Sequence, residues 1–191
     1  MVTLAHLRPE IQALAALPGA ERLAGLNSEH WIGYTRAHWA LAQLEALLTH
    51  EFGKVRPRNL LIVGPTNNGK TMIAEKFHRA HPPHTAANGA HEVIPVLRAQ
   101  MPAEPTTRRL YLELLIALGA PVGFHSRPDL REAVALRLMR AVGVRLLIID
   151  EAHNLLGATA RQQRELLNLL RFLGNELRIP LVCLGTRDAY L

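Results

Sequence analysis

The stretch Gly64-Pro65-Thr66-Asn67-Asn68-Gly69-Lys70-Thr71 decides the fold of this chain. It fits the pattern of a phosphate-binding P-loop, in which a glycine and four further residues precede Gly-Lys-Thr. Residues 59–63 are a short apolar run that is typical of a buried strand, and residues 72–77 are typical of the start of a helix. The order of strand, glycine loop and helix is the context in which this motif binds phosphate.

The residue types of this loop explain the chemistry. Gly64 and Gly69 let the backbone bend so that successive N–H groups point at an anion, which also faces the positive end of the helix dipole. Lys70 is placed to reach the β- and γ-phosphates, and the Thr71 hydroxyl to ligate Mg²⁺. The alternative is a glycine turn before an ordinary helix. The residues predicted to bind a nucleoside triphosphate are Gly64, Pro65, Thr66, Asn67, Asn68, Gly69, Lys70, Thr71 and Met72.

An acid pair downstream supplies the second half of the predicted site. The run Ile148-Ile149-Asp150-Glu151 places two acids at the end of an apolar strand, where ligands of open α/β sheets bind. Asp150 is predicted to hold Mg²⁺ through water, opposite Thr71. Glu151 is predicted to polarise the attacking water as a general base, with Lys70 as its catalytic partner. The alternative is a pair of acids that caps the next helix.

A polar residue follows a further apolar strand, predicted over residues 179–185. If that strand lies between the P-loop strand and the Asp150 strand, the hydroxyl of Thr186 points at the γ-phosphate. We therefore predict that Thr186 positions the water or senses the γ-phosphate, with Asn154 as a weaker alternative. Thr186 could instead be the N-cap of a helix.

The segment Trp31-Ile32-Gly33-Tyr34 stands just before the first long helix, predicted over residues 36–51. Aromatic and aliphatic side chains in such a place can line an adenine pocket by stacking and apolar contact. Trp31, Ile32 and Tyr34 are predicted to do so. The alternative is that these residues belong to the core or hold the helix down. The helix itself should bury one face, with Ala37, Leu41, Leu44 and Leu48.

Strands and helices alternate along the chain, which predicts an α/β domain with a mainly parallel sheet. We expect residues 1–28 to form one or two short helices and residues 29–191 to form the core domain. In the long amphipathic helix 161–177, one apolar face contains Leu166, Leu169, Leu170, Leu173 and Leu177. The predicted strands are 59–63, 92–98, 145–151 and 179–185, and residues 81–90 are predicted to be a loop.

The composition is that of a globular protein with one domain, because 49% of the 191 residues are hydrophobic and 20% are charged. No apolar run is long enough to span a membrane, and residues 1–9 do not resemble a signal peptide. The single Cys183 excludes an internal disulfide framework and agrees with a reducing, cytoplasmic location. Its apolar neighbours predict a buried structural thiol.

The charge balance is basic, with 22 Lys and Arg against 16 Asp and Glu. Most of the basic residues are Arg, whose planar fork suits phosphate recognition. A nucleic-acid partner and a solvated basic surface are equally compatible with this balance. Four histidines between residues 78 and 91 lack partners at metal-ligand spacing, so we interpret that segment as a polar surface loop.

The stretch Thr106-Thr107-Arg108-Arg109 opens the helix predicted over residues 106–118. Thr106 is a plausible N-cap. Two hydroxyls and two guanidiniums at a helix start form a compact patch that can bind phosphate. The alternative is a capped helix start in solvent.

Taken together, these motifs resemble those of the AAA+ ATPases, which have a three-layer α/β sandwich. Four segments are similar in particular to the TniB family of transposition ATPases, relatives of TnsC-like target-selection regulators. The resemblance covers the chain from about residue 25 to its end. The four segments are Trp31–Tyr34, Asn67–Met72, Gln100–Pro105 and Asp150–Asn154.

The resemblance implies Mg-dependent binding and hydrolysis of ATP and assembly on double-stranded DNA as a ring or filament. It also implies recruitment of a DDE-type transposase, with a TniQ-like protein as a further partner. Loop residues that follow the second strand would face the DNA. These are Thr106, Arg108 and Arg109, and with less support Ser126 and Arg127.

AAA+ proteins continue past the fourth strand with a fifth strand, an arginine finger and a helical lid, whereas this sequence stops at Leu191. We therefore expect an incomplete core, with the P-loop strand as an open edge and slow hydrolysis. Two other functions stay open. One is a nucleotide-gated interaction module that binds ATP as a structural ligand. The other is a helicase loader of the IstB or DnaC type.

Overall fold

The computed structural model describes residues 5, 7, 9–26, 31–120 and 128–187. The chain forms two compact units, Met1–Tyr34 and Thr35–Leu191. The first unit contains α1 (Pro9–Ala15) and α2 (Gly19–Leu26), as the break at Pro18-Gly19 predicts. The division after Tyr34 leaves Trp31, Ile32 and Tyr34 in the first unit, whereas the boundary predicted after residue 28 assigns them to the core.

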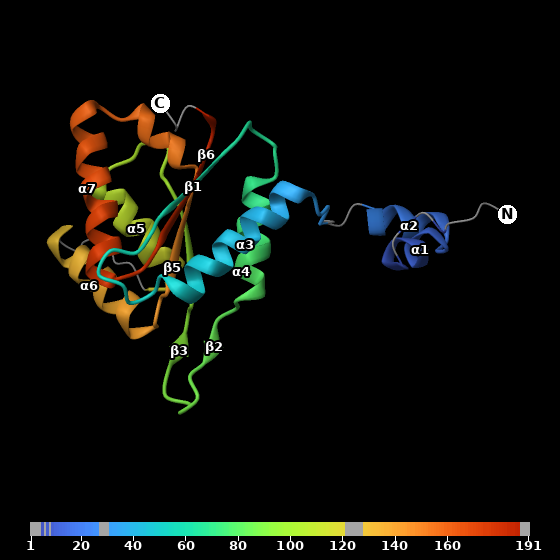
Figure 1. Cartoon of the computed structure of the whole chain (residues 1–191), viewed down its shortest axis with the longest axis horizontal. Coiled ribbons are helices and arrows are strands. Elements are labelled where there is room, and N and C mark those ends of the chain that lie inside the picture. Colours follow the sequence, from blue (N-terminus) through green and yellow to red (C-terminus); the bar gives the residue numbers. More distant parts are fainter. Residues whose placement is uncertain (1–4, 6, 8, 27–30, 121–127, 188–191) are drawn as a thin grey trace. The chain divides into compact units, whose positions relative to one another are not determined.

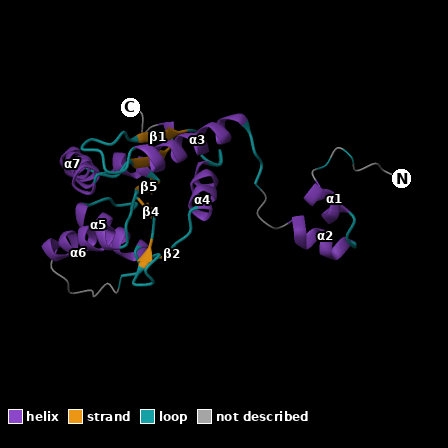
Figure 2. Ribbon diagram, turned by 60° about the horizontal axis from the view of Figure 1, so that its bottom comes forward, coloured by secondary structure: helices purple, strands orange, loops and turns teal. Residues whose placement is uncertain are grey.

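The second unit is built on a four-stranded parallel sheet in the order β1-β6-β5-β4. Helices α3 and α4 cover one face of this sheet, and α5, α6 and α7 cover the other (Figures 1 and 2). The structure therefore confirms the predicted three-layer α/β sandwich and the place of the fourth predicted strand between the P-loop strand and the Asp150 strand. The elements are α3 (Thr35–His50), β1 (Leu60–Val63), α4 (Lys70–Ala80), β2 (His84–Thr85), β3 (Glu92–Val93), β4 (Val96–Gln100), α5 (Thr107–Ala117), α6 (Pro128–Ala141), β5 (Leu146–Asp150), the 3₁₀ helix η1 (Ala152–Gly157), α7 (Ala160–Leu177) and β6 (Leu181–Gly185).

The prediction of one strand over residues 92–98 is wrong, because Pro95 divides it. Proline has no N–H to donate to a sheet ladder. Residues before it form β3, which pairs antiparallel with β2, and residues after it form β4. The predicted loop 81–90 thus contains a strand and the turn at Gly89, where φ is 69°. The resulting two-stranded ribbon extends beyond the main sheet (Figure 1).

The main core lies between the sheet and the layer of α5, α6 and α7. Every residue of β5 is buried, because helices cover both faces of the sheet at this strand. The predicted apolar face of α7 is confirmed: Leu166, Leu169, Leu170 and Leu173 are buried, and Leu177 packs against the same core. Gly174 allows this close approach, since a Cβ there would lie 3.4 Å from the carbonyl oxygen of Ile179.

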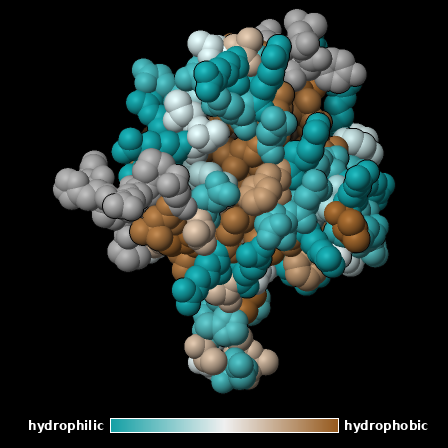
Figure 3. All heavy atoms as spheres, turned by 90° about the vertical axis from the view of Figure 1, so that its left-hand side faces the viewer, coloured by the Kyte–Doolittle hydropathy of each residue, from teal (hydrophilic) through white to brown (hydrophobic). Residues whose placement is uncertain are grey.

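The outer surface of the α7 layer also exposes apolar side chains (Figure 3). Leu167 and Phe172 of α7 are 55% and 40% exposed.

Cys183 of β6 is only partly exposed and packs against the core, and burial raises the pKa of its thiol to about 11. The thiol is therefore protonated at neutral pH.

Strand β1 is an edge of the sheet among the described residues, because it pairs with β6 alone. Its outward side chains Leu61 and Val63 are 43% and 36% exposed. The expected open edge at the P-loop strand is thus present in the described part of the chain. No helix there combines the length and the apolar composition needed to span a membrane.

Helix α3 buries a slightly different face from the predicted one. Ala37, Leu44 and Leu48 are buried as predicted, but Leu41 is only partly buried, and Leu47 is buried in addition. The observed face is centred closer to Leu44 and also includes Ala40, and α3 packs against α4.

The turn that links α3 to β1 is held by one buried carboxylate. Glu51 is 1% exposed and accepts hydrogen bonds from the backbone N–H of Arg58 at 3.0 Å, from Lys54 Nζ at 2.9 Å and from Arg58 Nε at 2.8 Å. The Arg58 backbone N–H, followed by the Lys54 and Arg58 side chains, lowers the pKa of Glu51 from 4.5 to about 2. This network fixes the start of the P-loop strand.

We expect Glu51→Gln to lower the free energy of unfolding at neutral pH. Since the folded-state pKa of Glu51 lies below its unfolded value, its contribution is fully present above pH 4.5 and is lost as the pH falls from 4.5 toward 2. Urea unfolding of both proteins across this range should therefore show a gap that narrows with acidification. A gap independent of pH would contradict this role for the Glu51 charge.

A second prediction uses neighbouring leucines of α7 that differ in burial. Leu166 is 0% exposed and Leu167 is 55% exposed. Leu166→Ala should cost about 2–5 kcal/mol of stability by leaving a cavity in the core, whereas Leu167→Ala should change it by about 0.5 kcal/mol or less. Denaturant titration of the two variants measures the difference. Equal losses would mean that α7 does not pack on this face.

Candidate nucleotide-binding site

The loop between β1 and α4 has the backbone of an anion cradle. Gly69 is the N-cap of α4 with φ 74°, and no side chain caps the helix there. Asn67 also lies in the left-handed region, with φ 60°. Left-handed residues that alternate with other conformations turn successive N–H groups to one side, toward the positive end of the helix dipole. Asn67 was not predicted to bend the chain, but asparagine tolerates this region better than most residues.

Gly64 contributes in another way than predicted, because its φ is not in the left-handed region. Its N–H donates to the carbonyl oxygen of Gly185 at 3.2 Å, so it ties the start of the loop to the end of β6. Lys70 Nζ lies over the same loop and donates to the carbonyl oxygens of Gly64 at 2.9 Å and Pro65 at 2.8 Å. The ammonium group is thus held at the mouth of the cradle.

The two acids stand at the carboxyl end of β5. Asp150 is 5% exposed, and its Oδ1 accepts the N–H of Glu151 at 2.9 Å, which orients the carboxylate. Glu151 has a left-handed backbone, with φ 55°, and occupies the N-cap position of η1, where its side chain makes no capping hydrogen bond. Its Oε2 lies 3.3 Å from His153 Nε2, so carboxylate and imidazole form an ion pair when the histidine is protonated.

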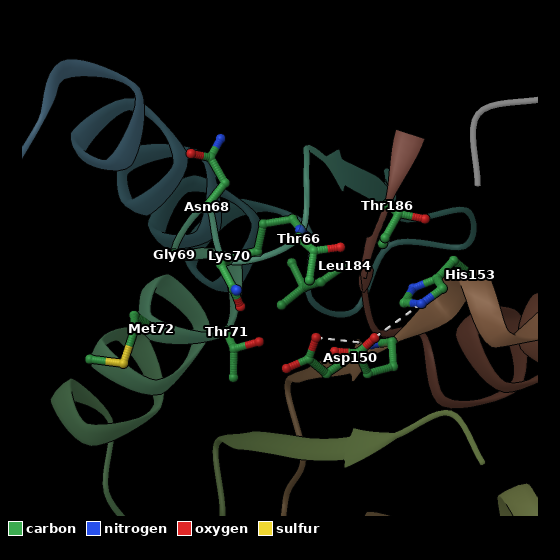
Figure 4. Close-up of a pocket in the computed structure, with 13 residues that line it drawn as sticks. Thr66, Asn68, Gly69, Lys70, Thr71, Met72, Asp150, His153, Leu184 and Thr186 are labelled. Atoms are coloured by element: carbon green, nitrogen blue, oxygen red, sulfur yellow. Dashed lines mark hydrogen bonds and ion pairs between the residues drawn. The ribbon is translucent and has the colours of Figure 1, made fainter. Parts of the chain in front are cut away.

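A cavity of about 380 Å³ brings these parts together (Figure 4). The P-loop forms one wall, the acid pair and His153 form another, and the end of β6 lies between them. Thr186 lines the cavity because β6 lies between β1 and β5 in the sheet. The lining residues are Thr66, Asn67, Asn68, Gly69, Lys70, Thr71, Met72, Asp150, Glu151, His153, Leu184, Gly185 and Thr186.

Three of these lining residues were not predicted, His153, Leu184 and Gly185. Nδ1 of His153 is buried and bonds to no described residue, while its Nε2 faces Glu151. The tight 3₁₀ turn of η1 returns the side chain two positions after Glu151 to the cavity, and no sequence pattern reports such a turn. Asn154, the weaker alternative for sensing, instead donates from Nδ2 to the carbonyl oxygen of Met101 at 2.9 Å.

The oxygen atoms of Thr71 and Asp150 fit a magnesium ion, since both side chains line this cavity and Mg²⁺ prefers hard oxygen ligands. In the described residues, no group of three or more His, Cys, Asp and Glu side chains could hold a metal ion. A cation here would therefore depend on phosphate oxygens and water for its remaining ligands.

The predicted adenine contacts belong to the first compact unit. Ile32 is 74% exposed and Tyr34 is 41% exposed, while Trp31 is partly buried. The contact of Trp31, Ile32 and Tyr34 with adenine stays a prediction.

The predicted DNA contacts lie at the start of α5. The Thr106 hydroxyl accepts the backbone N–H of Arg109 at 3.2 Å, so Thr106 is the N-cap. Arg109 Nη1 is 2.6 Å from Glu104 Oε2, which neutralises part of the basic patch, while Arg108 is exposed. Contact with DNA stays a prediction for these residues. Ser126 and Arg127 lie outside the described residues.

A parallel sheet in this strand order, with a P-loop after β1 and an acid pair after β5, defines a P-loop ATPase fold of the AAA+ type. The comparison with protein families then identifies the chain more narrowly. The family model described as "Bacterial TniB protein" matches residues 22–191. The chain belongs to this family.

Solved structures of two ORC proteins and one Cdc6 protein have the same fold. The ORC1 protein of Aeropyrum pernix, solved in complex with DNA, has a TM-score of 0.60 at 19% identity, over 83% of this chain and 41% of that one. Cdc6p of Pyrobaculum aerophilum has a TM-score of 0.55 at 20% identity, over 85% of this chain and 42% of that one. ORC2 of A. pernix, solved as ADPNP–ADP complexes, has a TM-score of 0.57 at 18% identity, over 83% of this chain and 44% of that one.

The chain thus spans less than half the length of these structures. No curated protein matches the sequence significantly.

We expect Thr106→Ala to lower the free energy of unfolding by about 0.5–2 kcal/mol, because the Arg109 N–H loses its capping acceptor. Thr107→Ala, in the same turn but not the N-cap, is the matched control and should cost less. Urea titration measures both. Equal stability of Thr106→Ala and the parent protein would show that the hydroxyl does not cap α5.

Proposed function

We propose that this chain is a Mg-dependent ATPase that binds double-stranded DNA and regulates transposition. In this function it assembles on DNA as a ring or filament, selects target DNA and recruits a DDE-type transposase, with a TniQ-like protein as a further partner. The observation that carries the proposal is the cavity in which Lys70 and Thr71 face Asp150, Glu151 and Thr186. Membership of the TniB family supports the role in transposition.

Each side chain of the cavity has a task in ATP hydrolysis. The ammonium of Lys70, now bonded to two loop carbonyl oxygens, would exchange them for oxygens of the β- and γ-phosphates. Thr71 and Asp150 would hold Mg²⁺, which neutralises phosphate charge. Glu151 would take a proton from the attacking water, and Thr186 would contact the γ-phosphate from the end of β6.

The proposed DNA contacts follow from charge and position. The net charge is +6, and the start of α5 presents the exposed Arg108 beside Thr106 and Arg109. The solved A. pernix ORC1 protein is bound to DNA, which supports this partner for a chain of the same fold. Binding through phosphates would carry little sequence specificity and would weaken as salt rises.

A nucleotide-gated interaction module is the second candidate, favoured by the contact between Glu151 and His153. While the imidazole lies against Oε2 of Glu151, that carboxylate oxygen is less accessible to an attacking water molecule. In that reading the chain would bind ATP and change its affinity for partners without turnover.

Two variants of the cavity test the proposal. Lys70→Ala should lower ATP affinity by roughly 10–100-fold, the value of a charge-assisted hydrogen bond, while Lys76→Ala on the exposed side of α4 serves as the control. Glu151→Gln should keep ATP affinity and lower kcat by roughly 100–10,000-fold, the value of a general base. Affinity is measured with a fluorescent ATP analogue, and turnover by phosphate release.

The DNA-binding test uses a fluorescein-labelled duplex of mixed sequence. Affinity should rise with Mg-ATP and fall steeply with salt in the parent protein, and Lys70→Ala should lose the ATP effect. ATP binding without turnover in the parent protein would favour the gated module. Absence of ATP binding would exclude both functions.

A further inference from the structure

Helix η1 lies between the nucleotide cavity and the loop that follows β4. Two consecutive residues of η1 contact different neighbours. His153 lines the cavity and faces Glu151, whereas Asn154 bonds to Met101, a residue 53 positions earlier in the chain. The 3₁₀ turn is therefore a short bridge from the acid pair to the start of the loop 101–106.

Both polar backbone groups of Met101 are hydrogen-bonded to the segment Asp150–Asn154, here called the acid segment. Its N–H donates to the carbonyl oxygen of Asp150 at 2.8 Å, and its carbonyl oxygen accepts Asn154 Nδ2 at 2.9 Å. The backbone N–H of Asn154 in turn donates to the carbonyl oxygen of Glu151 at 2.9 Å. Met101 is 0% exposed, so its position is set by these bonds and by core packing.

The loop after Met101 is short and stiff. Pro102 and Pro105 have φ fixed by their rings, and Pro105 is buried. The loop ends at Thr106, the N-cap of α5, two residues before the exposed Arg108. Two of the φ angles between Met101 and Thr106 are therefore restricted, which limits how far this loop can absorb a displacement of the Met101 peptide.

The two acids also border free space next to β4. Asp150 and Glu151 border a second cavity, of about 560 Å³, which is lined by Gln100 of β4 and Ile116 of α5. A small shift of the acids upon nucleotide binding can thus be accommodated on the side of β4.

We propose that Asn154 is the positioning residue that couples the nucleotide cavity to the loop 101–106 and the start of α5. Nucleotide that contacts Asp150 and Glu151 shifts η1, and the Asn154–Met101 bond transmits the shift. This inference rests on the proposed function for its two ligands, ATP and DNA. Coupling of this kind is reciprocal, so DNA must change ATP affinity by the same factor as ATP changes DNA affinity.

The first test uses hydrogen exchange of the full chain with and without Mg-ATPγS. In the parent protein, nucleotide should change exchange in the P-loop and also in residues 101–109. In Asn154→Ala, the change in the P-loop should stay and the change in residues 101–109 should be lost. Asn154→Leu, which keeps the branched shape of the side chain but has no N–H donor, should behave like Asn154→Ala. The exposed Asn168→Ala on α7 should behave like the parent protein.

The second test measures the coupling factor with the fluorescein-labelled duplex, as the ratio of DNA Kd without and with Mg-ATPγS. A factor of about 5–150 is typical of coupled sites, and Asn154→Ala should reduce it to about twofold or less. The affinity for each ligand alone should stay unchanged, which separates loss of coupling from loss of folding or binding.

The outcomes distinguish failure of the coupling inference from failure of the proposed function. If the parent protein binds ATPγS but residues 101–109 do not respond, or if Asn154→Ala keeps the response, the inference is overturned and the ATPase proposal survives. If the parent protein does not bind ATPγS, the proposed function fails first and the coupling inference fails with it. A response in residues 101–109 that depends on Asn154 supports the inference even where DNA binding is absent.

Discussion

The backbone hydrogen bonds that join β6 to β1 on one side and to β5 on the other are the interaction on which the site depends. Parallel strands end at a common edge, so this pairing brings the P-loop, the acid pair and Thr186 around one cavity. None of these residues could act on the same ligand without it. The buried side chains of β5 and the leucine face of α7 hold the pairing in place, because they fill the space between sheet and helices.

Local backbone conformation, in addition to strand pairing, shapes the cavity. Asn67, Gly69 and Glu151 all have positive φ, and all three line the cavity. Left-handed backbone is costly for residues other than glycine, and such positions gather where function requires a special geometry. At Glu151 this conformation turns the chain out of β5 into η1 and sends His153 to the cavity.

The same segment, Asp150–Asn154, connects the cavity to its surroundings. Its carbonyl and amide groups hold Met101, and through Met101 the short loop to Thr106. Thr106 is used as an N-cap, and Arg109 is paired with Glu104, so the start of α5 is an ordered platform and not only a cluster of charge. The proposed contact with DNA would therefore be made by residues whose positions depend on the acid segment.

The sequence by itself determined the features that depend on short spacing: the P-loop, the Asp150-Glu151 pair, the leucine face of α7 and the alternation of strands and helices. These features could be predicted because each depends on residues that lie close together in the sequence. The tertiary structure alone decided that Pro95 separates a ribbon from the main sheet, that His153 enters the cavity and that Asn154 holds Met101. The physical reason is clearest for Asn154 and Met101, which are 53 positions apart, so that only strand pairing and packing bring them within hydrogen-bonding distance.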